Sequence, residues 1–172
     1  MRDRATILQT LERQRAELAS RYRSFTDDVV VQPCTESETE GGERWTPKDH
    51  LAHLLRVERA FLAMARATAQ GGELPSVLGD GDRQSVLARV HRDNERHVAG
   101  LRERSVEELL AELDAARAET LSFLASIDDE QLDLVIPGAP WSDGTIGGVL
   151  LTNAHHEHQH LTWVDEGLAA ST

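Results

Sequence analysis

Histidine is concentrated near the end of this chain, and its spacing there is that of a metal site. Of eight histidines, four fall within six residues, at positions 155, 156, 158 and 160. Each residue of an α-helix advances by about 100°, so His156 and His160 share the apolar face while His155 and His158 point away from it. Two imidazoles one turn apart on one face can bind the same metal ion.

Two ligands hold a metal ion weakly, so a third is expected from another segment. A helix expected at about 46–71 places His50 and His53 on its apolar face. His53 lies a turn inside this helix and His50 at its exposed start, which favours His53. A single divalent ion would satisfy three imidazoles that are costly to bury unpaired. The sequence therefore predicts a mononuclear site of His53, His156 and His160. The alternative is that these are core histidines bonded within the protein, and His91 and His97 are expected at the surface.

The segment 156–160 reads His-Glu-His-Gln-His and so matches the His-Glu-x-x-His pattern of zinc peptidases. Those enzymes take a third ligand from downstream, but only twelve residues follow His160, and the extended pattern would need Gly and His at Trp163 and Glu166. Glu157 and His160 also match half of a di-iron pattern, whose second Glu-x-x-His pair is missing. Neither a peptidase nor a di-iron site is favoured.

Two other side chains near the predicted site could take part in chemistry. Glu157 falls at the border of the apolar helix face, where it is a candidate catalytic base or a partner of a ligand; the alternative is an exposed carboxylate on a solvated face. Glu58 is a weaker candidate. Cys34 lies in an acidic loop, which is expected to raise its pKa and argues against a catalytic thiol.

Helical spacing of apolar residues dominates the chain, so an all-α fold is expected. Thr46 followed by Pro47 indicates a helix start, and Ser105 with Glu108 forms a capping-box pattern that interrupts the third helical stretch. The simplest architecture is one domain, residues 1–172, folded as a four-helix bundle. Helices are expected at about 4–25, 46–71, 82–104, 105–127 and 145–167, with loops at 26–44, 72–81 and 128–144.

Composition limits the classes of partner and compartment. The 172 residues include 30 acidic and 18 basic side chains, a formal charge of −12. This charge argues against nucleic acid or an anionic membrane as a partner. No apolar run typical of a signal peptide or a membrane span occurs, so a cytoplasmic protein is expected. A single cysteine excludes an internal disulfide. Any thiol chemistry would therefore use a separate small molecule.

The order of motifs resembles the DinB-like (YfiT-like) superfamily of metal-binding four-helix bundles over nearly the full chain. These motifs are Trp45-Thr-Pro-Lys-Asp-His-Leu-Ala-His53-Leu, Asn94 in a central helix, Ser105-Val-Glu-Glu-Leu-Leu and His156-x-x-x-His160. Within the superfamily, the pattern is similar to the branch that contains the mycothiol-dependent maleylpyruvate isomerase N-terminal domain and the ClbS/DfsB-like proteins. The resemblance implies metal ligation by His53, His156 and His160, zinc or nickel as the metal, a long crossover between the second and third helices, and a homodimer.

The resemblance also implies a reaction class. Several members use mycothiol, bacillithiol or glutathione, which makes a divalent-metal-dependent S-transferase or isomerase acting on a small-molecule substrate the leading hypothesis. The ion would keep one coordination position open for a thiol or water. Three alternatives remain: a non-catalytic bundle that binds metal or sequesters a small molecule, a metal-dependent hydrolase, and a purely structural bundle.

Overall fold

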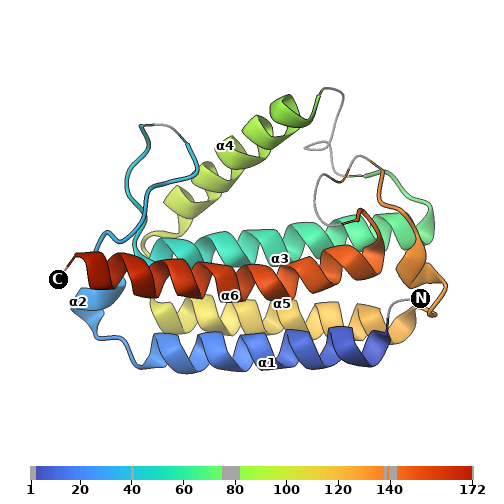
Figure 1. The fold of residues 1–172 in the computed structure, drawn as a ribbon, viewed down its shortest axis with the longest axis horizontal. Helices are drawn as coiled ribbons and strands as arrows, with labels where there is room; N and C mark the ends of the chain where they lie inside the picture. The colour runs from blue at the N-terminus through green and yellow to red at the C-terminus, as the bar shows by residue number, and fades with distance from the viewer. Residues whose placement is uncertain (1–2, 40, 75–81, 138, 140–142, 172) are drawn as a thin grey trace.

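The fold, seen in a computed structural model, is helical throughout and is described for residues 3–39, 41–74, 82–137, 139 and 143–171 (Figure 1). Within these ranges no β-strand occurs, and only isolated bridges join Thr35 to Trp45 and Val135 to Thr145. The all-α prediction is confirmed. No described helix is long and apolar enough to cross a membrane. The described elements are α1 (Arg4–Arg23), α2 (Asp27–Val30), α3 (Pro47–Gln70), α4 (Arg83–Leu101), α5 (Val106–Ser126), the 3-10 helix η2 (Gln131–Asp133) and α6 (Ile146–Ala170).

Helices α1, α3, α5 and α6 form the predicted four-helix bundle (Figure 1). Helices α3 and α5 run in the same direction and pack together, as do α1 and α6, while the two pairs are antiparallel to each other. The parallel neighbours α3 and α5 require a long connection, and α4 supplies it by running back along α3. The break expected at Ser105 thus separates the crossover helix α4 from the bundle helix α5.

Capping side chains set the helix starts that position the site. The Thr46 hydroxyl accepts a hydrogen bond from the Asp49 amide, and the Asp49 carboxylate accepts one from the Thr46 amide, which is a complete capping box. Gly71 ends α3 in the left-handed conformation with φ of 65°, which glycine adopts without strain. The same reciprocal bonds join Ser105 and Glu108 at the start of α5.

The bounds of the long helices agree with the prediction to within a few residues. The three segments expected to be loops differ in part: α2 lies inside 26–44 and η2 lies inside 128–144. Residues 75–81, 138 and 140–142 of the expected loops lie outside the described residues. Two apolar clusters fill the described bundle, one near each end. Between them lies a buried layer of charged and polar side chains, which are Arg15, Glu58, Arg117, Thr120, Asn153 and Glu157.

Candidate metal centre

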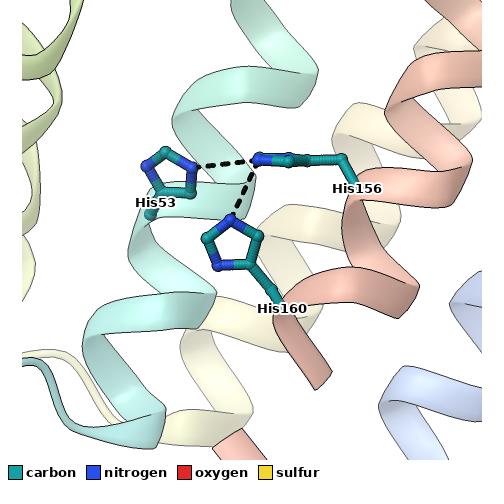
Figure 2. A group of neighbouring side chains, drawn as sticks. All are labelled: His53, His156 and His160. Carbon is teal, nitrogen blue, oxygen red and sulfur yellow. Dashed lines mark hydrogen bonds between the residues drawn. The ribbon is translucent and has the colours of Figure 1, made fainter. Parts of the chain in front are cut away.

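Three imidazoles from two helices converge on one point inside the bundle. His53 comes from α3, and His156 and His160 come from successive turns of α6 (Figure 2). The Nε2 atom of His156 lies 3.4 Å from Nε2 of His53 and 2.9 Å from Nε2 of His160. One nitrogen from each ring lies within 4.8 Å of the other two. The structure therefore brings together the three residues that the sequence selected.

Hydrogen bonding among these rings does not account for their arrangement as well as a metal ion does. One imidazole nitrogen either donates one hydrogen or accepts at one lone pair, yet Nε2 of His156 faces two neighbouring Nε2 atoms. Zinc–nitrogen bonds of 2.0–2.1 Å in a tetrahedron place two nitrogen ligands about 3.3 Å apart. The separations of 3.4 and 2.9 Å at His156 bracket this spacing, so the donor set fits a divalent ion.

A fourth histidine, His50, supports the cluster from behind. Its Nδ1 atom lies 2.7 Å from Nδ1 of His160, and its Nε2 atom lies 2.8 Å from the Thr35 hydroxyl. If His160 uses Nε2 as a ligand atom, its Nδ1 carries the hydrogen and donates it to His50. His50 then donates from Nε2 to Thr35. This chain fixes the tautomer and orientation of one ligand.

Burial keeps all four imidazoles neutral. Desolvation lowers the pKa of His50 and of His156 to about 4, and lowers the pKa of His53 and His160 well below the usual value. The neighbouring imidazoles add to the effect at His53 and His160. Only a neutral imidazole can bind a metal ion, so the fold holds these side chains in the ligand form at neutral pH. The exposed start that the sequence suggested for His50 is wrong, because its side chain is 1% exposed.

Two tryptophans enclose the cluster. The centroid of the buried Trp45 ring lies 5.1 Å from that of His53 and 5.3 Å from that of His50. The Trp163 and His160 rings pack edge to face, with their centroids 4.8 Å apart. Trp45 is buried and so shields the cluster from water on its side, whereas Trp163 is 42% exposed and lies at the solvent side of His160.

Glu38 places a carboxylate beside the cluster, and the sequence did not single it out. Its Oε1 atom lies 3.8 Å from Nε2 of His53, and its Oε2 atom accepts a hydrogen bond of 2.8 Å from Asn94. Burial raises its pKa, while the Asn94 hydrogen bond opposes that shift. Glu95 holds this loop in place by accepting from the Glu38 amide and from the Trp45 indole. The contacts of this loop with Asn94 and Glu95 join residues 50 to 57 positions apart, so no local pattern could have identified Glu38.

Two cavities reach the cluster. One, of about 280 Å³ between α3 and α4, is bordered by His53 and His156 and otherwise has mainly apolar walls. The second, of about 610 Å³, is bordered by His50, His160 and Trp163. Glu38 and His91 line both cavities. His91 is thus partly buried beside the cluster and is not the surface bystander that the sequence suggested.

Glu157 lies elsewhere. Its side chain is 1% exposed, and its Oε1 atom accepts from Nε of Arg15 at 3.0 Å and pairs with Arg117 at 3.1 Å. Burial raises its pKa, although both arginines oppose that shift. The expected alternative of an exposed carboxylate is wrong, because α6 packs against both α1 and α3. Glu157 thus pairs with the arginines of the buried charged layer rather than with the three imidazoles.

The structure also places the other side chains that the sequence analysis considered. Glu58 lies in the same layer, where Arg117 binds both of its carboxylate oxygens at 3.1 and 2.8 Å. The Cys34 thiol is buried, and burial raises its pKa to about 11 in spite of the nearby Arg44. His155 and His158 are exposed as expected, whereas His97 is half-buried. A reactive protein thiol is therefore absent from the described cluster.

Known proteins resemble this chain in sequence pattern and in fold. A family model described as the DinB superfamily matches residues 37–164, which include all three converging histidines. A crystal structure of an uncharacterised protein from Escherichia coli UTI89 superposes with a TM-score of 0.74 at 17% identity, covering 98% of this chain and 94% of the other. The structure of the colibactin self-resistance protein ClbS with double-stranded DNA gives 0.73 at 16% identity, covering 95% and 94%. No curated protein matches by sequence.

The ClbS complex corrects one expectation from composition. The formal charge of −12 was expected to exclude nucleic acid as a partner, yet a protein of this fold is seen bound to double-stranded DNA. Net charge is a sum over the whole surface, whereas a duplex touches only a part of it, so the sum does not decide whether a duplex can bind. The exclusion of nucleic acid is wrong.

Proposed function

Because the chain belongs to the DinB superfamily, we propose that His53, His156 and His160 hold one divalent metal ion, zinc or nickel. We further propose that the protein is a metal-dependent S-transferase or isomerase that uses a low-molecular-weight thiol, such as mycothiol or bacillithiol. The observation that supports this proposal is the convergence of three neutral imidazole nitrogens within 4.8 Å. It matches the three-ligand pattern of catalytic zinc sites, which leave one position open.

A divalent ion supplies the chemistry of ionising a coordinated thiol at neutral pH. The residues of the chain orient the ligand imidazoles and shield the cluster from water. Three neutral imidazoles add no negative charge to the site, His50 and Thr35 hold His160 in one tautomer, and Trp45 covers the cluster. Glu38 places a carboxylate beside the cluster, where it can accept a hydrogen bond from a bound substrate.

A separate thiol fits the rest of the molecule. Cys34 is buried and its pKa is raised to about 11, so it does not serve as a nucleophile. Transfer between a thiol and a second substrate requires access for both molecules. The two cavities provide it, because one borders His53 and His156 while the other borders His50 and His160.

A second candidate is a bundle that binds and sequesters a small molecule without turnover. The fold shared with ClbS, which is named for self-resistance to colibactin, favours this reading. The cavity between α3 and α4 would hold the sequestered molecule without any reaction at the metal. Formation of a mycothiol or bacillithiol adduct with an electrophile at a rate that depends on the metal would distinguish catalysis from sequestration.

Elemental analysis of purified variants tests the metal site itself. We expect the unmodified protein to carry about one metal ion per chain and His156→Ala to lose it. His158→Ala is the matched control, because His158 is exposed on the same helix two residues away; it should keep the metal. Unchanged metal content in His156→Ala would contradict the assignment. We also propose that the chain forms a homodimer, and light scattering tests this by measuring the mass of the protein in solution.

A further inference from the structure

The cavity between α3 and α4 carries an inference about what the substrate looks like. It has a volume of about 280 Å³ and ends at the imidazoles of His53 and His156. Its walls are largely aliphatic and aromatic side chains of the two helices, namely Val57, Ala60, Phe61, Met64, Leu87 and Val90. It is therefore an apolar chamber that opens onto two proposed metal ligands.

Polar groups also line this chamber. Glu38 and Asn94 are bonded to each other at 2.8 Å, and Thr152 and His91 border the same cavity. Arg56 and Arg59 also border the cavity, but each is paired with a carboxylate, of Asp93 and of Glu112 respectively. Moving a charge into such surroundings is costly unless a partner awaits it. An uncharged group is the better occupant.

We propose that this chamber is the subsite for an uncharged apolar group of the substrate, about the size of a substituted benzene ring or somewhat larger, whose reacting end lies at His53 and His156. A cavity of about 150 Å³ is large enough for benzene, and this one has about 280 Å³. The inference rests on the proposed function, because it takes the three-histidine cluster as the reaction centre. It adds the class of substrate: a compact hydrophobic molecule with one polar or electrophilic end. The polar thiol then enters by the larger cavity beside His50, His160 and Trp163.

Met64 permits a direct test of the chamber. The chain has two methionines, Met1 and Met64, and the Met64 side chain is 1% exposed and lines the cavity. In protein labelled with ¹³C at the methionine methyl groups, we expect benzyl alcohol to shift the Met64 signal saturably. For so small a ligand the Kd should be on the order of a millimolar. An unshifted Met64 signal would overturn the inference, whatever the metal content.

Two variants locate the binding. Ala60→Phe fills the chamber from α3, and Leu87→Trp fills it from α4; either should abolish the shift. Ala111→Phe, at an exposed position of α5, is the matched control and should leave it intact. If both filling variants are folded by circular dichroism and still bind benzyl alcohol, the chamber is not the site.

Cobalt-substituted protein tests whether the chamber adjoins the metal site. It also distinguishes a failure of the proposed subsite from a failure of the proposed thiol-dependent function. Thiol binding at the metal produces a sulfur-to-cobalt charge-transfer band. Benzyl mercaptan combines the two partners in one probe, because its ring can occupy the chamber while its sulfur binds the metal. We expect it to bind at least about tenfold more tightly than 2-mercaptoethanol, because its ring is buried, and Ala60→Phe to remove this advantage. Equal affinities would overturn the subsite while leaving the metal function standing. No band with either thiol, together with a Met64 shift, would instead overturn the thiol-dependent function.

Discussion

Nδ1 of His50 lies 2.7 Å from Nδ1 of His160, which connects the start of α3 to a proposed metal ligand near the middle of α6. This contact makes His50 the support of a ligand rather than a ligand itself. Groups in that position commonly change metal affinity by 10–100-fold when they are removed.

We therefore expect His50→Ala to weaken metal binding by roughly 10–100-fold while the stoichiometry at saturation stays at one. His50→Asn should recover part of the loss, because its amide oxygen can accept the hydrogen of His160. Competition with a chelator of known affinity measures both effects. His155→Ala, at an exposed position, serves as control, and equal affinity in His50→Ala and this control would contradict the supporting role.

Removing one partner from the buried charged layer should be costly to stability. Glu58 accepts bonds from Arg117 at 3.1 and 2.8 Å and from Asn153 at 2.7 Å. Burial by itself would raise its pKa, but Arg117, Thr120 and Arg15 bring the pKa of Glu58 below its usual value. Glu58→Gln removes one of the two carboxylate charges, of Glu58 and Glu157, that neutralise the buried Arg15 and Arg117. One buried positive charge is then unpaired, so we expect a loss of roughly 3–5 kcal/mol in the free energy of unfolding.

Urea denaturation measures this loss, and the chain offers a matched comparison. Glu119 pairs with Arg66 at the surface, 3.1 Å away, with 62% and 41% of the two side chains exposed. Glu119→Gln should cost less than about 1 kcal/mol. Similar costs for the two variants would show that the buried layer contributes no more than a surface pair.

Acid should destabilise the metal-free protein before its carboxylates titrate. Unfolded histidine has a pKa near 6.5, whereas burial lowers the folded pKa to about 4 for His50 and His156 and further for His53 and His160. Between these values the unfolded chain binds more protons, so stability falls as the pH falls. The slope is up to about 1.4 kcal/mol per pH unit for each histidine.

Urea midpoints of chelated protein at pH 7.5, 6 and 5 test this dependence. Replacing His156 by Leu should reduce the slope by about one proton, whereas replacing the exposed His158 should leave it unchanged. Metal binding should weaken over the same acidic range, because protons compete for the ligand nitrogens. A stability that is flat from pH 7.5 to 5 would contradict the neutral buried state of these histidines.

Gly167 controls how closely α6 approaches the loop that carries Thr35 and Glu38. A Cβ atom at this position would lie 2.1 Å from the Cys34 carbonyl oxygen. Gly167→Ala must therefore push the loop away, at a cost of roughly 1–3 kcal/mol, and should weaken metal binding through the displaced Thr35. Thermal unfolding and chelator competition measure the two effects.

Gly100 is the matched control for this substitution. It lies in α4, and a Cβ atom there would meet no atom within 4 Å. Because alanine favours a helix over glycine, Gly100→Ala should stabilise the protein by up to about 1 kcal/mol. A Gly167→Ala protein as stable as the Gly100→Ala protein would show that the loop does not depend on this close approach.

Local sequence determined the helices and the three central histidines. Periodicity and the caps at Thr46 and Ser105 depend on neighbours within one turn, so the starts of α3 and α5 were predictable. The four-residue spacing of His156 and His160 fixes their common face in the same way. His53 followed because it lies a full turn inside an amphipathic helix.

Tertiary structure alone decided which other residues surround the cluster. His50 is buried because the segment around Thr35 and Trp45 folds over the start of α3, and Glu157 is buried because α6 contacts more than one neighbour. Glu38 reaches His53 through bonds of its loop to Glu95 and Asn94. A helical repeat reports which residues share a face, but burial depends on what covers that face, and here the covering segments are distant in sequence.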